Sequence, residues 1–187
     1  MRGSYNLSFV MGKASGAQFR IAVLAEDQYQ VLEIWYPLLR LKEAGIQTHV
    51  IGSGTKDVYG SKEGYPVKVD FSIEKVKAAD YDGVLIPGGF APDFMRRNPK
   101  MAQFVREIHD QGKVTAAICH GGWMLVSAGI LKGRKATSFF AIKDDLIAAG
   151  AKWMDQEVVV DGNLVTSRKP DDLPAFTLEI IKHLKTQ

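Results

Sequence analysis

Short apolar runs alternate with longer amphipathic stretches along most of this chain, and this order severely restricts the possible folds. The runs of strand length lie at residues 19–25, 46–51, 83–86 and 114–118. The stretches with helical spacing lie between and after them, at 31–44, 100–111, 122–128, 141–149 and 170–184. Parallel strands need connections of helix length, and the helices then cover both faces of the sheet. The alternation therefore predicts an α/β fold with a doubly wound, mostly parallel sheet.

Turn residues indicate the shorter features of the predicted fold. Asp161-Gly162-Asn163 lies between two apolar runs and is typical of a β-hairpin. We also expect a loop at 52–64, a short edge strand at 65–69 and a short helix at 72–76.

The chain length predicts a single folded unit. Its 187 residues are close to the ~150 residues typical of one domain. We expect one α/β domain over residues 19–187, preceded by a flexible leader over residues 1–18.

Composition excludes several classes of protein. Apolar residues make up 46% of the chain and charged residues 24%, which is ordinary for a globular domain. The net charge of +3 is scattered, so we expect no nucleic-acid partner. No apolar run approaches the ~18 residues of a membrane span, and the start lacks the apolar core of a signal peptide. The one cysteine excludes an intramolecular disulfide and a Cys-based zinc site. We therefore expect a cytoplasmic protein without a membrane partner.

The segment around Cys119 is the most informative one for function. An expected buried strand ends at Ile118 and runs directly into Cys119, and glycines and an expected helix follow. Ala117 and Gly121 are small enough for the tight turn of a nucleophile elbow. A helix N-terminus stabilises the thiolate, which is the form that attacks carbonyl groups. The pattern favours a nucleophile over the alternative, a small buried apolar residue.

Histidines offer one candidate base. On a sharp turn, the imidazole of His120 can reach the neighbouring thiol and act as a base or ion-pair partner. A surface or helix-capping histidine is an equally compatible alternative. The other three histidines lie on an expected strand end and on expected helices, and we interpret them as structural: His49, His109 and His183.

The Pro-Gly-Gly turn at 87–89 follows another expected strand. The carboxyl ends of parallel strands share one edge of the sheet, where ligands bind. Without side chains, Gly88 and Gly89 let the backbone approach a ligand, and their N–H groups are candidate oxyanion donors. A plain tight turn is the alternative.

Three carboxylates follow the first expected strand. Glu33 lies on the expected helix face of Gln30. A carboxylic acid held beside a thiol can stay protonated and donate a hydrogen bond to the sulfur. We interpret the other two, Glu26 and Asp27, as solvent-facing turn residues.

The chain resembles the ThiJ/PfpI family. Within this family it is most similar to the PfpI-like intracellular proteases and their stress-protein relatives. The resemblance covers about residues 19–185. Four motifs in register carry it: LIPGGFAPD (85–93), AICHG (117–121), GILKGRKATS (129–138) and VVVDGNLVTSRKPDDLPAF (158–176). It implies a flavodoxin-like α/β sandwich, related to class I glutamine amidotransferases, that works as a homodimer or hexamer.

The resemblance also implies a role for each candidate residue. Cys119 falls on the family nucleophile, His120 on its histidine, and Glu33 on the glutamate that hydrogen-bonds the thiol. Gly89 falls on the oxyanion turn, together with the backbone N–H of His120. Asp93 falls where PfpI-like members carry an acid, usually Glu, that reaches the histidine of a neighbouring subunit.

The chain departs from the family pattern at three places. Gly122-Trp123 stands where many members have Pro-Gln, and Gln30 replaces a common acidic residue. Asp93 is one methylene shorter than Glu. The alternative role for Asp93 is to cap the short helix after Pro92.

These residues predict a Cys-dependent hydrolase or lyase that attacks activated carbonyl groups and needs no cofactor or metal. The resemblance implies peptidase, glutathione-independent glyoxalase or deglycase activity on a peptide, a small dicarbonyl or a glycated protein. The alternative is a redox-sensing or chaperone-like stress-response protein, in which Cys119 oxidises to a sulfinate that Glu33 stabilises. His120 favours the enzyme, because a sensor needs only the thiol and its acid.

Two further classes fit the sequence poorly. A phosphoacceptor receiver domain would carry an acid at the end of a later strand, where this chain has Pro-Gly-Gly. A glutamine amidotransferase would have a His-x-Glu pair after the nucleophile, and this sequence has none.

Overall fold

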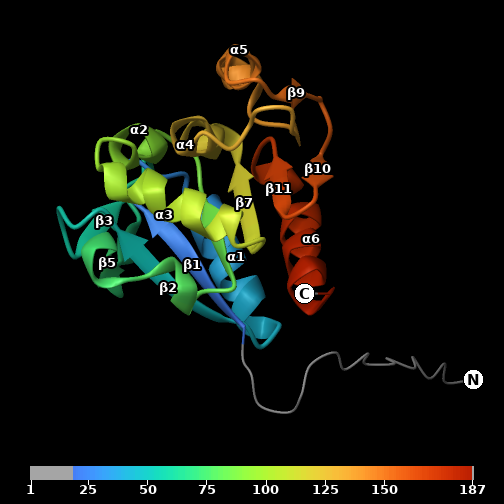
Figure 1. Cartoon of the computed structure of the whole chain (residues 1–187). Helices are drawn as coiled ribbons and strands as arrows, with labels where there is room; N and C mark the ends of the chain where they lie inside the picture. Colours follow the sequence, from blue (N-terminus) through green and yellow to red (C-terminus); the bar gives the residue numbers. More distant parts are fainter. Residues whose placement is uncertain (1–18, 187) are drawn as a thin grey trace, which may run out of the picture.

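The computed structural model describes residues 19–186, which fold around a seven-stranded sheet (Figure 1). The expected leader at residues 1–18 lies outside the described residues. All neighbouring strands of the sheet are parallel except the hairpin at one edge, which confirms the predicted doubly wound sheet. The strand order is β10 (Val158–Asp161), β11 (Leu164–Ser167), β7 (Val114–Ile118), β6 (Gly83–Ile86), β1 (Arg20–Ala25), β2 (Gln47–Gly52) and β5 (Phe71–Ser72).

Helices cover the sheet in two groups, one on each face (Figure 1). On one face α1 (Val31–Glu43) contacts α6 (Leu173–Thr186), and on the other α3 (Pro99–Asp110) contacts α4 (Gly122–Ala128). The short helices α2 (Ala91–Met95) and α5 (Lys143–Ala148) both contact α4.

Local sequence explains where the long helices begin and which face they bury. The side chain of Gln30 accepts hydrogen bonds from two N–H groups in the first turn of α1, and Asn98 caps α3 in the same way. Apolar residues at helical spacing then face the sheet, including Ile34 and Leu41 on α1 and Phe104 and Ile108 on α3.

Several short elements differ from the expectations. The loop expected at 52–64 contains a strand, β3 (Val58–Gly60), which pairs with β4 (Pro66–Lys68) in a separate two-stranded sheet. The strand expected at 65–69 is therefore not at an edge of the main sheet. Strand β3 has only three residues, and Tyr59 is its single buried side chain. One buried residue produces no detectable alternation of apolar and polar residues in the sequence. A second small sheet pairs β8 (Lys135–Ala136) with β9 (Lys152–Trp153).

Single-turn 3-10 helices replace or precede some expected α-helices. The helix expected at 72–76 is the single turn η1, and the helices expected at 141–149 and 170–184 begin with the turns η4 and η5. The turns are η1 (Ile73–Lys75), η2 (Ala78–Asp80), η3 (Cys119–Gly121), η4 (Phe140–Ile142) and η5 (Pro170–Asp172).

The central strands bring the candidate residues to one edge of the sheet. Val23 on β1 pairs with Leu85 on β6, and Ile86 on β6 pairs with Ala117 on β7, so the three strands end side by side. Their residues are buried, apart from the first one of β1. The segments that follow these strands therefore meet at the carboxyl edge, as predicted.

None of the helices in the described range 19–186 has the length and apolar character needed to cross a membrane.

Candidate active site

Cys119 lies on a strained turn between β7 and α4. Its φ of 59° is in the left-handed region, which a non-glycine residue occupies at a cost of about 1–3 kcal/mol. A Cβ at Gly121 would lie 2.6 Å from the carbonyl oxygen of Ile86, so only glycine fits there. Cys119 forms no disulfide and is buried, with 7% of its surface exposed. This is the strand–turn–helix geometry of a nucleophile elbow.

Glu33 lies in the first turn of α1 and is completely buried. Its Oε2 accepts a hydrogen bond of 2.6 Å from the N–H of Gly88, whereas Oε1 has no hydrogen-bond partner of good geometry among the described residues. Burial raises the pKa of Glu33 to about 8, so the carboxyl group is protonated at neutral pH. Hydrogen bonds with the N–H of Gly88 and the thiol of Cys119 lower the pKa of Glu33, against the larger effect of burial.

The thiol and the carboxyl group are electrostatically coupled. Burial, together with a charged Glu33, raises the pKa of Cys119 to about 12. Backbone N–H groups of His120 and Gly89 act in the opposite direction. A protonated Glu33 removes the repulsion and supplies a hydrogen-bond donor. The thiolate and a neutral Glu33 are therefore the compatible pair of states.

His120 is held against the thiol. Its Nδ1 lies 3.3 Å from the Sγ of Cys119, and its ring stacks on Phe139 at 5.0 Å between centroids. The ring of Trp123, whose indole N–H donates to Asp145, makes a T-shaped contact with the imidazole at 5.2 Å between centroids. Burial lowers the pKa of His120, so the imidazole is neutral at neutral pH and can accept a proton. The imidazole is half-buried and contacts both the thiol and Phe139.

The Pro-Gly-Gly turn brings backbone groups to the thiol. A Cβ at Gly88 would lie 2.8 Å from the Cβ of Cys119 and 2.7 Å from the backbone nitrogen of His120. The N–H of Gly88 donates to Glu33, so the proposal of Gly88 as an oxyanion donor is wrong: the buried carboxyl group uses it. The N–H groups of Gly89 and His120 remain directed at the sulfur of Cys119.

Asp93 lies inside α2. Its carboxylate forms an ion pair of 2.5 Å with Arg97, one turn further along. It forms no hydrogen bond with His120 within the described part of the chain. The alternative role of Asp93 as a helix cap is wrong, because the N-cap of α2 is Phe90 and Asp93 follows inside the first turn. The role at a neighbouring subunit stays a prediction.

The interpretation of Glu26 as a solvent-facing residue is wrong. Its side chain is only 5% exposed and accepts a hydrogen bond from Ser53, which follows β2. Asp27 is half-buried and forms an ion pair with Lys56 at 2.5 Å. No local pattern indicates that Ser53, 27 residues away, meets Glu26.

The other histidines have structural hydrogen bonds. One ring nitrogen of His49 lies 3.1 Å from the Tyr81 hydroxyl, His109 contacts Asn163, and His183 contacts the backbone of its own helix. Phe139 is the site residue that sequence reasoning missed. It lies after β8, and only the packing of that segment against η3 brings it to His120.

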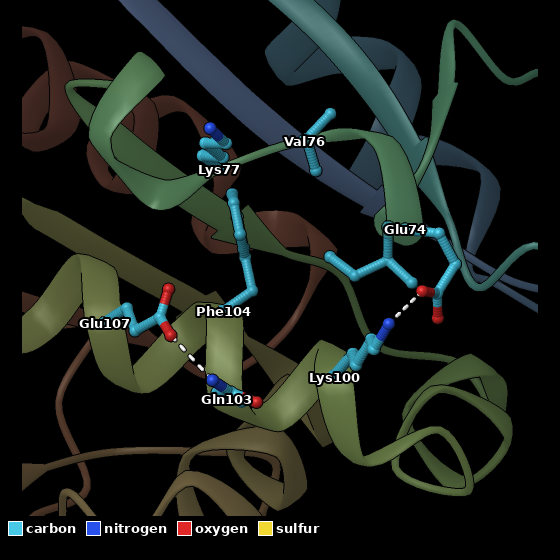
Figure 2. A pocket seen from close by; sticks show the side chains of 8 residues that line it. Glu74, Val76, Lys77, Lys100, Gln103, Phe104 and Glu107 are labelled. Carbon is cyan, nitrogen blue, oxygen red and sulfur yellow. Dashed lines mark hydrogen bonds and ion pairs between the residues drawn. The ribbon is translucent and has the colours of Figure 1, made fainter.

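A surface groove of about 210 Å³ lies elsewhere, between η1 and α3 (Figure 2). Two polar pairs lie in its walls: Lys100 forms an ion pair with Glu74, and the amide of Gln103 donates a hydrogen bond to Glu107. Its walls contain no residue of the Cys119 site, so we do not assign it to the chemistry. A cavity of about 290 Å³ beside Phe139 is closer to the thiol, and its walls include Phe140 and Trp153.

The fold and the site together define a class. It is a flavodoxin-like protein with a buried cysteine on a strained turn after a central strand. A histidine and a buried carboxyl group lie beside the thiol. The sequence profile of the DJ-1/PfpI family matches residues 19–183. The chain belongs to this family.

Individual relatives share most of the sequence. Deglycase PfpI of Pyrococcus furiosus is 46% identical over 166 residues, which cover 89% of this chain and 99% of that protein. The protein named "Putative cysteine protease YraA" of Bacillus subtilis is 43% identical over 167 residues, covering 89% of this chain and 98% of that one. A crystal structure from Anabaena variabilis, of a protein with DJ-1/ThiJ/PfpI-like and ferritin-like domains, has a TM-score of 0.87 and 42% identity. That match covers 89% of this chain and 48% of the other.

Proposed function

We propose that this protein is a Cys119-dependent enzyme that acts on activated carbonyl groups, with deglycation of early methylglyoxal adducts as its activity. The observation that carries the proposal is the contact of 3.3 Å between the Sγ of Cys119 and the Nδ1 of His120. The N–H groups directed at the same sulfur support it, and so does the name deglycase of the Pyrococcus relative.

The first chemical step follows from the geometry. The thiol proton passes to Nδ1 of the neutral His120, and the thiolate attacks the carbonyl carbon of the substrate. A C–S bond forms, and the electron pair of the C=O bond moves to oxygen. The N–H groups of Gly89 and His120 are placed to donate to that oxyanion, and the imidazolium can return its proton to it or to a leaving group.

Glu33 sets the charge state of the nucleophile in this proposal. It keeps its proton at neutral pH because burial raises its pKa to about 8. A protonated carboxyl group stabilises the thiolate, whereas a charged one would repel it. Glu33 therefore acts on the thiol rather than on the substrate.

Peptide hydrolysis is the second candidate activity. The Bacillus relative bears a protease name, and the cavity beside Phe139 has aromatic and charged side chains in its walls that suit a peptide segment. The same first step on an amide would form a tetrahedral intermediate. Collapse of this intermediate re-forms the C=O bond, breaks the C–N bond and leaves a thioester. The released amine would take the proton from His120, and water would then cleave the thioester.

We further propose a homo-oligomer whose sites are completed between subunits. His120 has no carboxylate partner within the described part of its own chain, and a histidine base works best when another group orients it. Asp93 is the candidate acid from a second copy. The exposed rings of Phe90 and Phe140 beside the site, 51% and 72% exposed, suit a protein–protein contact.

A turnover comparison tests the proposal. Wild-type protein is assayed on methylglyoxal, a fresh methylglyoxal–thiol adduct and a fluorogenic peptide, with Cys119→Ser as the blank. We expect the enzyme to turn over the methylglyoxal–thiol adduct fastest of the three substrates. We expect Cys119→Ser to be inactive on every substrate. Faster turnover of the peptide would favour the second candidate. Retention of most activity by Cys119→Ser would end the assignment of Cys119.

A further inference from the structure

A second cavity lies at the carboxyl edge of the sheet, beyond β1 and β2. It has a volume of about 320 Å³ and is lined by Glu26, Ser53, Thr55, Phe94, Arg97 and Asn98. Its walls contain none of the residues around Cys119. Strand β1 lies between β2 and β6, so the chain order reverses there. Open α/β sheets bind ligands beyond the strand ends at such a point.

The buried carboxylate of Glu26 is the central polar group of this cavity. Its oxygens accept hydrogen bonds from the hydroxyl groups of Ser53 and Thr55 and from the N–H of Asp27. Accepting at both oxygens is the behaviour of an ionised carboxylate. No lysine or arginine forms an ion pair with it in the described part of the chain. Lys56 interacts with Glu26 only through a longer-range charge effect. A buried carboxylate without an ion-pair partner is costly, and a cationic ligand could neutralise it.

The cations nearby are already neutralised by other carboxylates. Lys56 forms an ion pair with Asp27 at 2.5 Å, and Arg97 forms one with Asp93 at 2.5 Å. Within this group of five charged residues, the charge left over is that of Glu26.

Hydroxyl oxygens lie around Glu26, and the cavity wall also contains the guanidinium group of Arg97 and the amide of Asn98. Ser53 and Thr55 use their protons on the carboxylate, and the Tyr59 hydroxyl, which lies 3.1 Å and 3.0 Å from theirs, is left to donate to one of them. The amide of Asn98 donates to the backbone oxygen of Ser53. The hydroxyl oxygens keep lone pairs that can accept hydrogen bonds from a ligand.

We infer that this cavity binds the primary ammonium group of a small organic cation. A primary ammonium group carries one positive charge and three N–H donors, and it has no hydrogen-bond acceptor. Its charge complements the single carboxylate of Glu26, and its N–H groups can donate to the carboxylate and the nearby hydroxyl oxygens. The ring of Phe94, with the Arg97 guanidinium 4.5 Å from its centroid, lines the cavity and can contact the carbon stem. The described residues contain no cluster of three or more Asp, Glu, His or Cys side chains able to hold a metal ion. The site is separate from Cys119 and goes beyond the proposed function.

Titration with n-butylammonium, followed by the amide NMR signals of the 15N-labelled full chain, tests this inference. We expect saturable shifts at Asp27, Ser53 and Thr55, and no such shifts with n-butanol, which has the same stem without the charge. The Cys119→Ser protein should bind equally well, because the thiol takes no part. This last result is independent of whether the proposed enzymatic activity holds.

Three variants sharpen the test. Glu26→Gln removes the charge at constant size and should weaken binding about tenfold or more. Thr55→Val removes an acceptor at an exposed position and should weaken binding about threefold. Glu74→Gln, in the groove of Figure 2, is the matched control and should bind like the wild type.

Three outcomes would overturn the inference. They are equal affinity for n-butanol, unchanged affinity in both Glu26→Gln and Thr55→Val, and shifts confined to the groove around Glu74. If Glu26→Gln fails to fold, the comparison of Thr55→Val with Glu74→Gln decides the question.

Discussion

The Nδ1 of His120 lies 3.3 Å from the Sγ of Cys119, although the two residues are neighbours in the chain. Successive side chains of an extended strand point to opposite sides. The left-handed backbone of Cys119, with φ 59°, turns both side chains toward one another. A local backbone strain therefore creates the pair of reactive groups, and the packed ring of Phe139 holds the imidazole in place.

The role of Glu33 is testable by alkylation of the single thiol. Glu33→Leu removes the donor to sulfur, so it should raise the thiol pKa and slow alkylation near neutral pH about tenfold. Glu33→Gln retains a donor and cannot ionise, so it should react much like the wild type. Rates are measured with iodoacetamide from pH 6 to 10. Equal rates in wild type and Glu33→Leu would show that Glu33 only fills space.

Stability should fall with pH because of the same carboxyl group. In the folded protein burial raises the pKa of Glu33 from 4.5 to about 8, so above pH 4.5 the unfolded chain releases a proton that the folded protein keeps. The wild type should therefore lose about 1.4 kcal/mol per pH unit relative to Glu33→Gln within that window. Urea unfolding at pH 5 and pH 7.5 measures the difference. The exposed Glu43→Gln is the control, and a parallel pH dependence of all three proteins would contradict the prediction.

The glycine turn beside the thiol should not tolerate a side chain. Gly89 has φ 70°, and a Cβ there would lie 2.4 Å from the backbone oxygen of Gln28. Gly133 has a similar φ of 77° with nothing within 4 Å, so it is the matched control. We expect Gly133→Ala to lose about 1–2 kcal/mol of unfolding free energy, and Gly89→Ala to lose clearly more. Similar losses in both variants would mean that the turn can move aside.

Subunit mixing tests whether Asp93 completes a neighbour's site. Cys119→Ser and Asp93→Ala should each be inactive alone. After subunit exchange, a mixed dimer pairs an intact Cys119 and His120 with the intact Asp93 of the other subunit. An equal mixture of dimers should then recover about a quarter of the wild-type activity. If native mass spectrometry shows exchange and no activity returns, Asp93 has no role in trans.

The overall architecture could be predicted from the chain alone, because it depends on local periodicity. Buried strands 83–86 and 114–118 and the helix at 122–128 were expected at the observed bounds. Parallel strands then had to end at one edge, so the meeting of Cys119 with the Pro-Gly-Gly turn followed from topology. Very short strands such as β3 could not be predicted, since one buried residue has no period.

Side-chain partners were mostly beyond the reach of the sequence. The residue types around Cys119 already indicated a strained turn, because small neighbours are needed there whatever lies around it. Burial and pairing are properties of the folded chain: Glu26 meets Ser53 from another strand, and Gly88 donates to Glu33 rather than to a substrate. Such contacts join segments far apart in the chain, and the free energy of burial that selects them has no local signature.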